Sequence, residues 1–244
     1  ACTEVTRCPA ERPEWVDLFE PIATEQRDAL ATFASQFSVD VSRLDDDIVH
    51  EMNEAFGPDV FTQVQVVYVQ DFLPRTLAVL GEVFGSSYSL AAEPPNGFIK
   101  LWPALEQFMD AVIRIGALDD VTLEVVRLRG ARQHDCRLCR SRRSREALDA
   151  GADEALFDEI DRGADGDLSD RHKAAVALVD AIIWTPGAIP ADVVAAVRAH
   201  FTPEEAVDLI LNVMRNAANK IAVALDADTP NVAEGVEIYA VRPS

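Results

Sequence analysis

The chain has 244 residues, and 42 acidic side chains against 22 lysines and arginines give a formal net charge of −20 at pH 7. Hydrophobic residues make up 49% of it, which is enough for a packed core and excludes an intrinsically disordered protein. The negative charge argues against nucleic-acid binding, which needs a basic surface. No run reaches the roughly 18 apolar residues of a membrane span, and residues 1–4 do not resemble a signal peptide. We therefore expect a soluble, cytoplasmic protein that contacts neither nucleic acid nor membrane.

Apolar residues recur with helical spacing along almost the whole chain, and no segment shows the sustained alternation of a half-buried strand. The sequence therefore predicts an all-α fold. In the first part of the chain, helices are expected over residues 17–37, 42–56 and 59–84. Ser42 is predicted to begin the second helix as an N-cap, Gly57-Pro58 to end it, and Pro74 to kink the third.

Residues 85–97 are rich in Ser, Pro and Asn, and we expect a linker or surface loop there. This loop separates an N-terminal half, residues 1–97, from a C-terminal half, residues 98–244, which together should form one compact domain. Helices of the second half are predicted over 98–115, from 119 or 120 onward, and over 136–150, 153–160, 169–183 and 203–225. Asp135 is expected to cap the helix over 136–150, and Thr202 with Glu205 forms a capping box.

An internal repeat relates the two halves. With an ungapped offset of 145 residues, Thr24–Leu80 aligns with Ser169–Leu225, and helix caps, prolines and helix lengths agree. The aligned pairs include Phe56 with Phe201, Pro58 with Pro203, and Arg75 with Lys220. We interpret this agreement as a duplicated three-helix unit, although two unrelated helical hairpins of similar length would look alike.

The charge is distributed unevenly. The arginine-rich segment, residues 127–145, holds eight arginines against one aspartate, a net charge of +7, so the other 225 residues carry −27. Two of the four cysteines, Cys136 and Cys139, lie in this segment. We therefore expect the functional site here, and an acidic docking partner would be steered toward it.

A Cys-x-x-Cys pair without a secretory signal indicates redox or metal chemistry more than a structural disulfide. If Cys136 lies in the first turn of a helix, the unpaired backbone N–H groups and the nearby arginines favour its thiolate, which is the nucleophilic form. Two cysteines three residues apart on one helix share a face and can close a disulfide.

Two other interpretations of the pair stay open. A structural zinc site needs four ligands, and only His134 is a nearby candidate, while Cys2 and Cys8 lie far off at the N-terminus. The pair can also be two buried core cysteines. Cys2 and Cys8 themselves can form a small disulfide loop or remain idle thiols.

Glu124 precedes Cys136 by twelve residues on the preceding predicted helix. If the two helices form an antiparallel hairpin, its carboxylate folds back over the cysteines, where it can shuttle a proton or pair with an arginine. A solvated glutamate is equally compatible with the spacing. His134 is a second candidate acid or base, against the simpler role of an exposed loop histidine.

These residues carry a family resemblance. Glu124-x11-Cys136-x2-Cys139, followed by Ala147 and Gly151, resembles the core motif of the carboxymuconolactone decarboxylase superfamily, in its alkylhydroperoxidase AhpD-like branch. The resemblance covers residues 98–228. Its downstream parts are Leu168-Ser169-Asp170-Arg171, Phe201-Thr202-Pro203-Glu204-Glu205, and Asn212 to Asn219 before Ala222.

The resemblance implies a helical, duplicated fold, a trimer or higher homo-oligomer, and a thiol oxidoreductase without cofactor or metal. Its substrate would be a hydroperoxide or a protein disulfide, with a thiol reductant or a lipoyl or thioredoxin-like carrier as partner. By position, Cys139 attacks the peroxide, Cys136 resolves the sulfenic acid as a disulfide, and Glu124 belongs to the proton relay. The electrostatic argument instead favours Cys136 as the more acidic thiol, and both assignments stay open.

The sequence departs from this family at one position. The family has a histidine four residues after the second cysteine, where this chain has Arg143. Arginine does not relay protons at neutral pH, but it can hold a thiolate or pair with Glu124 bidentately. The alternatives are therefore a redox-sensing or interaction module of the same fold, and a lyase resembling carboxymuconolactone decarboxylase.

Overall fold

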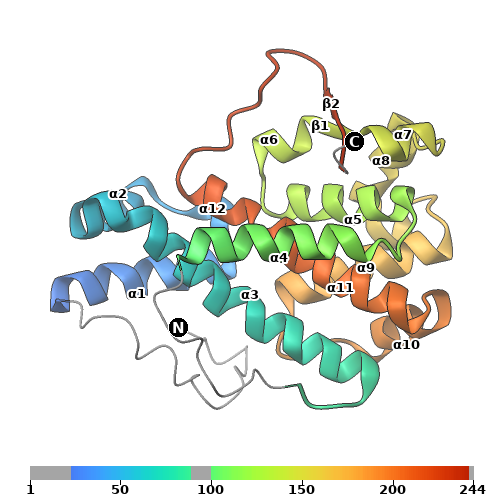
Figure 1. The fold of residues 1–244 in the computed structure, drawn as a ribbon, viewed down its shortest axis with the longest axis horizontal. Coiled ribbons are helices and arrows are strands. Elements are labelled where there is room, and N and C mark those ends of the chain that lie inside the picture. The colour runs from blue at the N-terminus through green and yellow to red at the C-terminus, as the bar shows by residue number, and fades with distance from the viewer. Residues whose placement is uncertain (1–22, 89–99, 242–244) are drawn as a thin grey trace.

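The computed structural model describes residues 23–88 and 100–241, so Cys2, Cys8 and most of the expected 85–97 loop lie outside the described residues. The described chain is essentially all-α, as the apolar periodicity predicts (Figure 1). None of its helices combines the length and the apolar character that crossing a membrane requires. The longer helices are α1 (Thr24–Val39), α2 (Asp46–Phe56), α3 (Val60–Phe84), α4 (Leu101–Ile115), α5 (Asp120–Gln133), α9 (Asp170–Trp184), α10 (Ala191–His200) and α11 (Pro203–Ala217).

Side-chain caps mark the starts of four of these eight helices, α2, α5, α9 and α11. Asp119 accepts the Thr122 N–H at the start of α5, Ser169 accepts the His172 N–H at the start of α9, and Thr202 forms the predicted capping box with Glu205. At α2 the prediction was wrong, because Asp45 caps the helix, while Ser42 lies in a preceding 3-10 turn, Val41–Arg43.

The helix boundaries follow the offset of 145 residues closely. Shifted by that offset, α1 coincides with α9 and α2 with α10 to within one residue, and α3 covers α11 and the short α12 (Asn219–Ala224). The third helix differs between the units: α3 runs continuously through Pro74, where we expected a kink, whereas Ala218 separates α11 from α12. These boundaries support the interpretation as a duplicated three-helix unit.

Arg75 joins the two units at equivalent positions. Its guanidinium donates to the carbonyls of Ser38 at 2.7 Å and Ile183 at 2.6 Å, which are 145 residues apart. Asp71 accepts hydrogen bonds from both Arg75 and Lys220, the residues that the offset aligns. Burial lowers the pKa of Lys220 to about 8 although Asp71 opposes this shift.

One hydrophobic core extends across both halves. It runs from Ala29 in α1 to Ala224 in α12 and includes Phe33, Phe72, Leu178 and Leu209, all nearly inaccessible to solvent. A smaller cluster lies beneath α7 (Arg145–Asp149), α8 (Glu154–Glu159) and the 3-10 turn η4 (Ile160–Asp165). α7 and α8 therefore rest on packed apolar side chains.

The predicted helix over 136–150 is not continuous. Residues 137–149 form α6 (Arg137–Arg140), a three-residue strand β1 (Arg142–Ser144) and α7. β1 pairs in parallel with β2 (Glu237–Tyr239), with Arg143 opposite Ile238. The interruption has a tertiary cause, because β2 belongs to the C-terminal segment, residues 226–241, which leaves α12 and returns over α6 to β1 (Figure 1).

Candidate functional site

The cysteine pair lies on the short turn that follows α5, residues 134–141, here called the cysteine turn. Cys136 and Cys139 are joined by a disulfide, with their Cα atoms 5.3 Å apart. Cys136 itself is the N-cap of α6, and its Sγ accepts the Cys139 N–H at 3.2 Å. The prediction that Asp135 caps this helix was therefore wrong. Asp135 has a left-handed backbone, with φ of 51°, and reverses the chain between α5 and α6.

The two cysteines differ in their access to solvent. Cys136 is only 1% exposed, whereas Cys139 is partly exposed. Of the two residues, Cys139 is therefore the more accessible to a reagent from solvent. This difference bears directly on which thiol reacts with an external substrate.

Glu124 does lie over the cysteine turn, but its carboxylate is fully engaged. It is 1% exposed, and its two oxygens accept hydrogen bonds from the Arg127 Nε and Nη2 atoms, each at 2.7 Å. One of these oxygens also accepts the Ser144 N–H at 3.0 Å. The expected arginine pairing is present with Arg127 instead of Arg143, and the solvated alternative was wrong.

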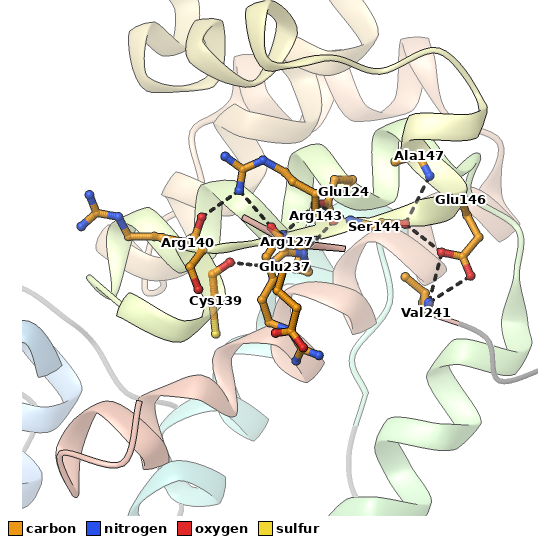
Figure 2. Close-up of polar contacts among 12 residues, drawn as sticks. Glu124, Arg127, Cys139, Arg140, Arg143, Ser144, Glu146, Ala147, Glu237 and Val241 are labelled. Atoms are coloured by element: carbon orange, nitrogen blue, oxygen red, sulfur yellow. Dashed lines mark hydrogen bonds and ion pairs between the residues drawn. The ribbon is translucent and has the colours of Figure 1, made fainter. Parts of the chain in front are cut away.

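Arg127 connects this carboxylate to the cysteine turn. Its Nη1 donates to the Cys139 carbonyl and its Nη2 to the Arg142 carbonyl, both at 2.7 Å (Figure 2). Its guanidinium also lies against the Tyr239 ring of the C-terminal segment. Arg127 was missed by sequence reasoning, although its position three residues after Glu124 on one helix face is a signal that could have identified it.

Arg143 was assigned the wrong partner. Its Nε and Nη2 bind the two carboxylate oxygens of Glu154 at 2.8 Å, and its Nη1 binds the carbonyls of Arg140 and Arg142. Figure 2 shows the Cys139 side chain directed away from the Arg143 guanidinium. Arg143 thus ties the turn to α8 and does not pair with Glu124.

The arginine-rich segment is largely neutralised in the fold. Among the described residues, seven of its eight arginines form ion pairs, and only the exposed Arg145 has none. Their partners are Glu124, Asp135, Glu154, Asp161, Asp180, Asp226, Asp228 and Glu237. The segment therefore has less free positive charge to attract an acidic partner than the sequence suggests.

His134 is buried between α5 and α12. Its Nδ1 lies 2.9 Å from the Asn219 side-chain oxygen, while its Nε2 is buried without a hydrogen-bond partner among the described residues. Burial, reinforced by the Lys220 ammonium, lowers the pKa of His134 to about 3. The prediction that His134 is an exposed loop histidine was therefore wrong. A neutral imidazole with so low a pKa is a poor proton acceptor at pH 7.

Asp228 is a second residue that the sequence did not indicate. It is 2% exposed and belongs to the C-terminal segment. Its carboxylate accepts the Arg137 N–H at 2.7 Å, and its carbonyl accepts the Leu138 N–H at 2.8 Å. No sequence signal connects it to the cysteines, because 91 residues separate it from Arg137.

A surface cleft of about 460 Å³ lies beside α6 and is lined by Arg132, Arg137, Arg140, Ser141, Arg143 and Asp161. Each of its four arginines has a carboxylate partner. Over residues 23–88 and 100–241, no three His, Cys, Asp or Glu side chains converge as a metal site.

Two curated proteins from Mycobacterium tuberculosis strains are similar to this chain, the uncharacterized protein Rv2313c and the uncharacterized protein MT2376. Each is 43% identical over 228 aligned residues, which cover 87% of this chain and 77% of the relative. No protein-family model matches the chain, and no solved structure matches it.

Proposed function

The chain belongs to the family of these two mycobacterial proteins, and we propose that it is a dithiol–disulfide oxidoreductase that cycles Cys136 and Cys139 between the dithiol and the disulfide. The observation that carries this proposal is the bonded pair itself, in which a buried Cys136 is joined to a partly exposed Cys139. The resemblance to AhpD-like proteins, stated from the motif, points to the same chemistry.

The difference in exposure assigns the two steps. In the reduced protein, the Cys139 thiolate attacks one sulfur of a substrate disulfide, so that a mixed disulfide forms and the other substrate sulfur leaves as a thiolate. Cys136 then loses its proton and attacks the Cys139 sulfur, which restores the Cys136–Cys139 disulfide and releases the second substrate thiol. Two electrons pass from the dithiol to the substrate, and an external dithiol reverses the cycle.

Disulfide exchange suits this site better than peroxide reduction does. Peroxide cleavage by a thiolate needs a proton for the departing alkoxide. The two candidate relays are poorly placed for this, because Arg127 and Ser144 occupy the Glu124 oxygens and His134 is buried and neutral. We therefore propose a protein or lipoyl-type disulfide as the main substrate and hydroperoxides as slower ones.

The cellular location and the oligomeric state belong to the same proposal. A dithiol that is reduced in every cycle suits the cytoplasm, where thiols are kept reduced. The resemblance adds a trimer or higher homo-oligomer, which light scattering of the purified protein measures directly.

A single-turnover experiment tests the proposed reaction. The reduced protein is mixed rapidly with oxidised lipoamide or, separately, with cumene hydroperoxide, and the products are followed by non-reducing mass spectrometry. We expect lipoamide to give the Cys136–Cys139 disulfide at least about tenfold faster than it oxidises free cysteine. Hydroperoxide oxidation is expected to be slower than the lipoamide reaction.

The two cysteine variants form a matched pair. Cys136→Ser should react at Cys139 without forming an intramolecular disulfide, whereas Cys139→Ser should not react. Oxidation by both reagents no faster than that of free cysteine would contradict the enzyme and favour a redox-sensing module. Faster reaction with the hydroperoxide would instead identify a peroxidase.

A further inference from the structure

Asp228 brings a buried negative charge to the cysteine turn. Its Oδ2 accepts the N–H of Arg137, the residue that follows Cys136, and its Oδ1 accepts the Arg137 Nε at 2.9 Å. Burial alone would raise the pKa of Asp228, but the hydrogen bonds from the Arg137 side chain and backbone outweigh it and hold that pKa below its usual value. Asp228 is therefore an anion at neutral pH.

This arrangement changes the environment of Cys136 in two ways. The carboxylate stands beside the N-cap residue, so a second anion on the Cys136 sulfur would be repelled by it. In addition, Asp228 and Asp226 together bind the guanidinium of Arg137, the first residue of α6, which is then not available to a Cys136 thiolate. The Arg137 and Leu138 N–H groups are likewise occupied by Asp228.

Cys139 is placed differently. Its carbonyl accepts a hydrogen bond from the Arg127 guanidinium, and the residue is partly exposed, so that water has closer access to a thiolate there than at Cys136. The other charged and titratable groups around the turn are the neutral His134, the exposed Arg140–Asp135 pair, the Arg142–Glu237 and Arg143–Glu154 pairs, and Lys220, which is paired with Asp71. Each of these cations is bound by a carboxylate, and the hydrogen bond that the Cys136 Sγ accepts from the Cys139 N–H is the contact that opposes the effect of Asp228.

We propose that Asp228 is a positioning residue that directs attack to Cys139 by keeping Cys136 protonated until the mixed disulfide has formed. This inference rests on the proposed function for its role in turnover. The order in which the two thiols ionise, which is what the inference states, does not depend on any substrate. In this arrangement the C-terminal segment sets the direction of the reaction at a turn that it contacts from 91 residues away.

The ionisation order is measured by alkylation of the reduced protein with iodoacetamide between pH 5 and 10. Trypsin cleaves after Arg137, which places Cys136 and Cys139 on separate peptides, so that mass spectrometry gives a rate for each thiol. In the unaltered protein we expect the midpoint pH of alkylation to be lower for Cys139 than for Cys136. The opposite order would overturn the proposal without any variant.

Asp228→Asn removes the charge and keeps a side-chain oxygen for the Arg137 N–H. We expect it to lower the midpoint pH of Cys136 by about one unit. Asp226→Asn is the matched control, because Asp226 binds the same guanidinium but is 86% exposed in its side chain and bonds to no backbone N–H of α6. It should shift the midpoint by less than about 0.3 units.

Equal shifts in the two variants would also contradict the proposal. Circular dichroism would show whether Asp228→Asn still folds. If it does not, the proposal is tested by the order of the Cys136 and Cys139 alkylation midpoints in the unaltered protein. A lower midpoint for Cys139 combined with no disulfide exchange would leave this inference standing and refute the proposed function, so the two failures are distinguishable.

Discussion

Glu124 and Arg127 form a buried, bidentate ion pair that fastens the cysteine turn to α5. The carboxylate is 1% exposed, and the guanidinium continues from it to the carbonyls of Cys139 and Arg142. The pair therefore acts on the geometry of the turn, and the motif glutamate is a structural anchor in this chain. Its two oxygens accept three hydrogen bonds from Arg127 and Ser144, which leaves the carboxylate little freedom to act as a proton relay.

Glu124→Gln should destabilise the protein by about 3 kcal/mol, because it leaves the Arg127 guanidinium buried without its counter-charge. Urea denaturation followed by circular dichroism measures the free energy of unfolding. Glu154→Gln is the matched control, since Glu154 makes the same bidentate contact with Arg143 but is 57% exposed in its side chain. That variant should lose at most about 1 kcal/mol, and equal losses would contradict the anchoring role.

Arg143→Ala should leave the alkylation midpoint of both cysteines unchanged, within about 0.3 units, because every donor group of Arg143 is bound to Glu154 or to a backbone carbonyl. It should cost about 2 kcal/mol of stability through loss of those contacts and of packing on Phe157. This reverses the expectation from the sequence, in which Arg143 holds a thiolate.

Arg143→His places the histidine of the resembled family at this position and extends the same test. We expect no gain in peroxide turnover, since the Arg143 side chain lies on the side of the turn away from the Cys139 sulfur (Figure 2). A rise of tenfold or more would show that the histidine alone restores a relay.

His134 should make the protein less stable in acid. Its pKa is about 3 in the folded protein and about 6.5 in the unfolded chain, so the unfolded chain binds the extra proton between these values. The contribution of His134 is complete above pH 6.5 and is lost as the pH falls toward 3, with a slope of about 1.4 kcal/mol per pH unit.

The free energy of unfolding, measured in urea between pH 4 and 7.5, checks this slope. His134→Gln should flatten it, whereas His200→Gln, which removes an exposed histidine, should not. Parallel curves for the His134 variant and the unaltered protein would refute a neutral, buried imidazole.

Local signals in the sequence determined the helical architecture. Periodic apolar residues and side-chain caps such as Asp119, Ser169 and Thr202 act over one or two turns, so they place α5, α9 and α11 without knowledge of the rest of the chain. The same locality made Cys136 and Cys139 recognisable as a pair and placed Glu124 near them. The offset of 145 residues also anticipated that Arg75 and Lys220 would occupy related places.

Only the tertiary structure decided which residues pair with one another at the site. The sequence presents eight arginines as a positive segment, but the carboxylates that neutralise them come from as far away as Asp180, Asp228 and Glu237. Likewise, the helix expected over 136–150 is broken because β2 binds β1 and Asp228 binds the first turn of α6. Such partners are selected by packing and burial across the whole chain, and neither periodicity nor motif spacing contains that information.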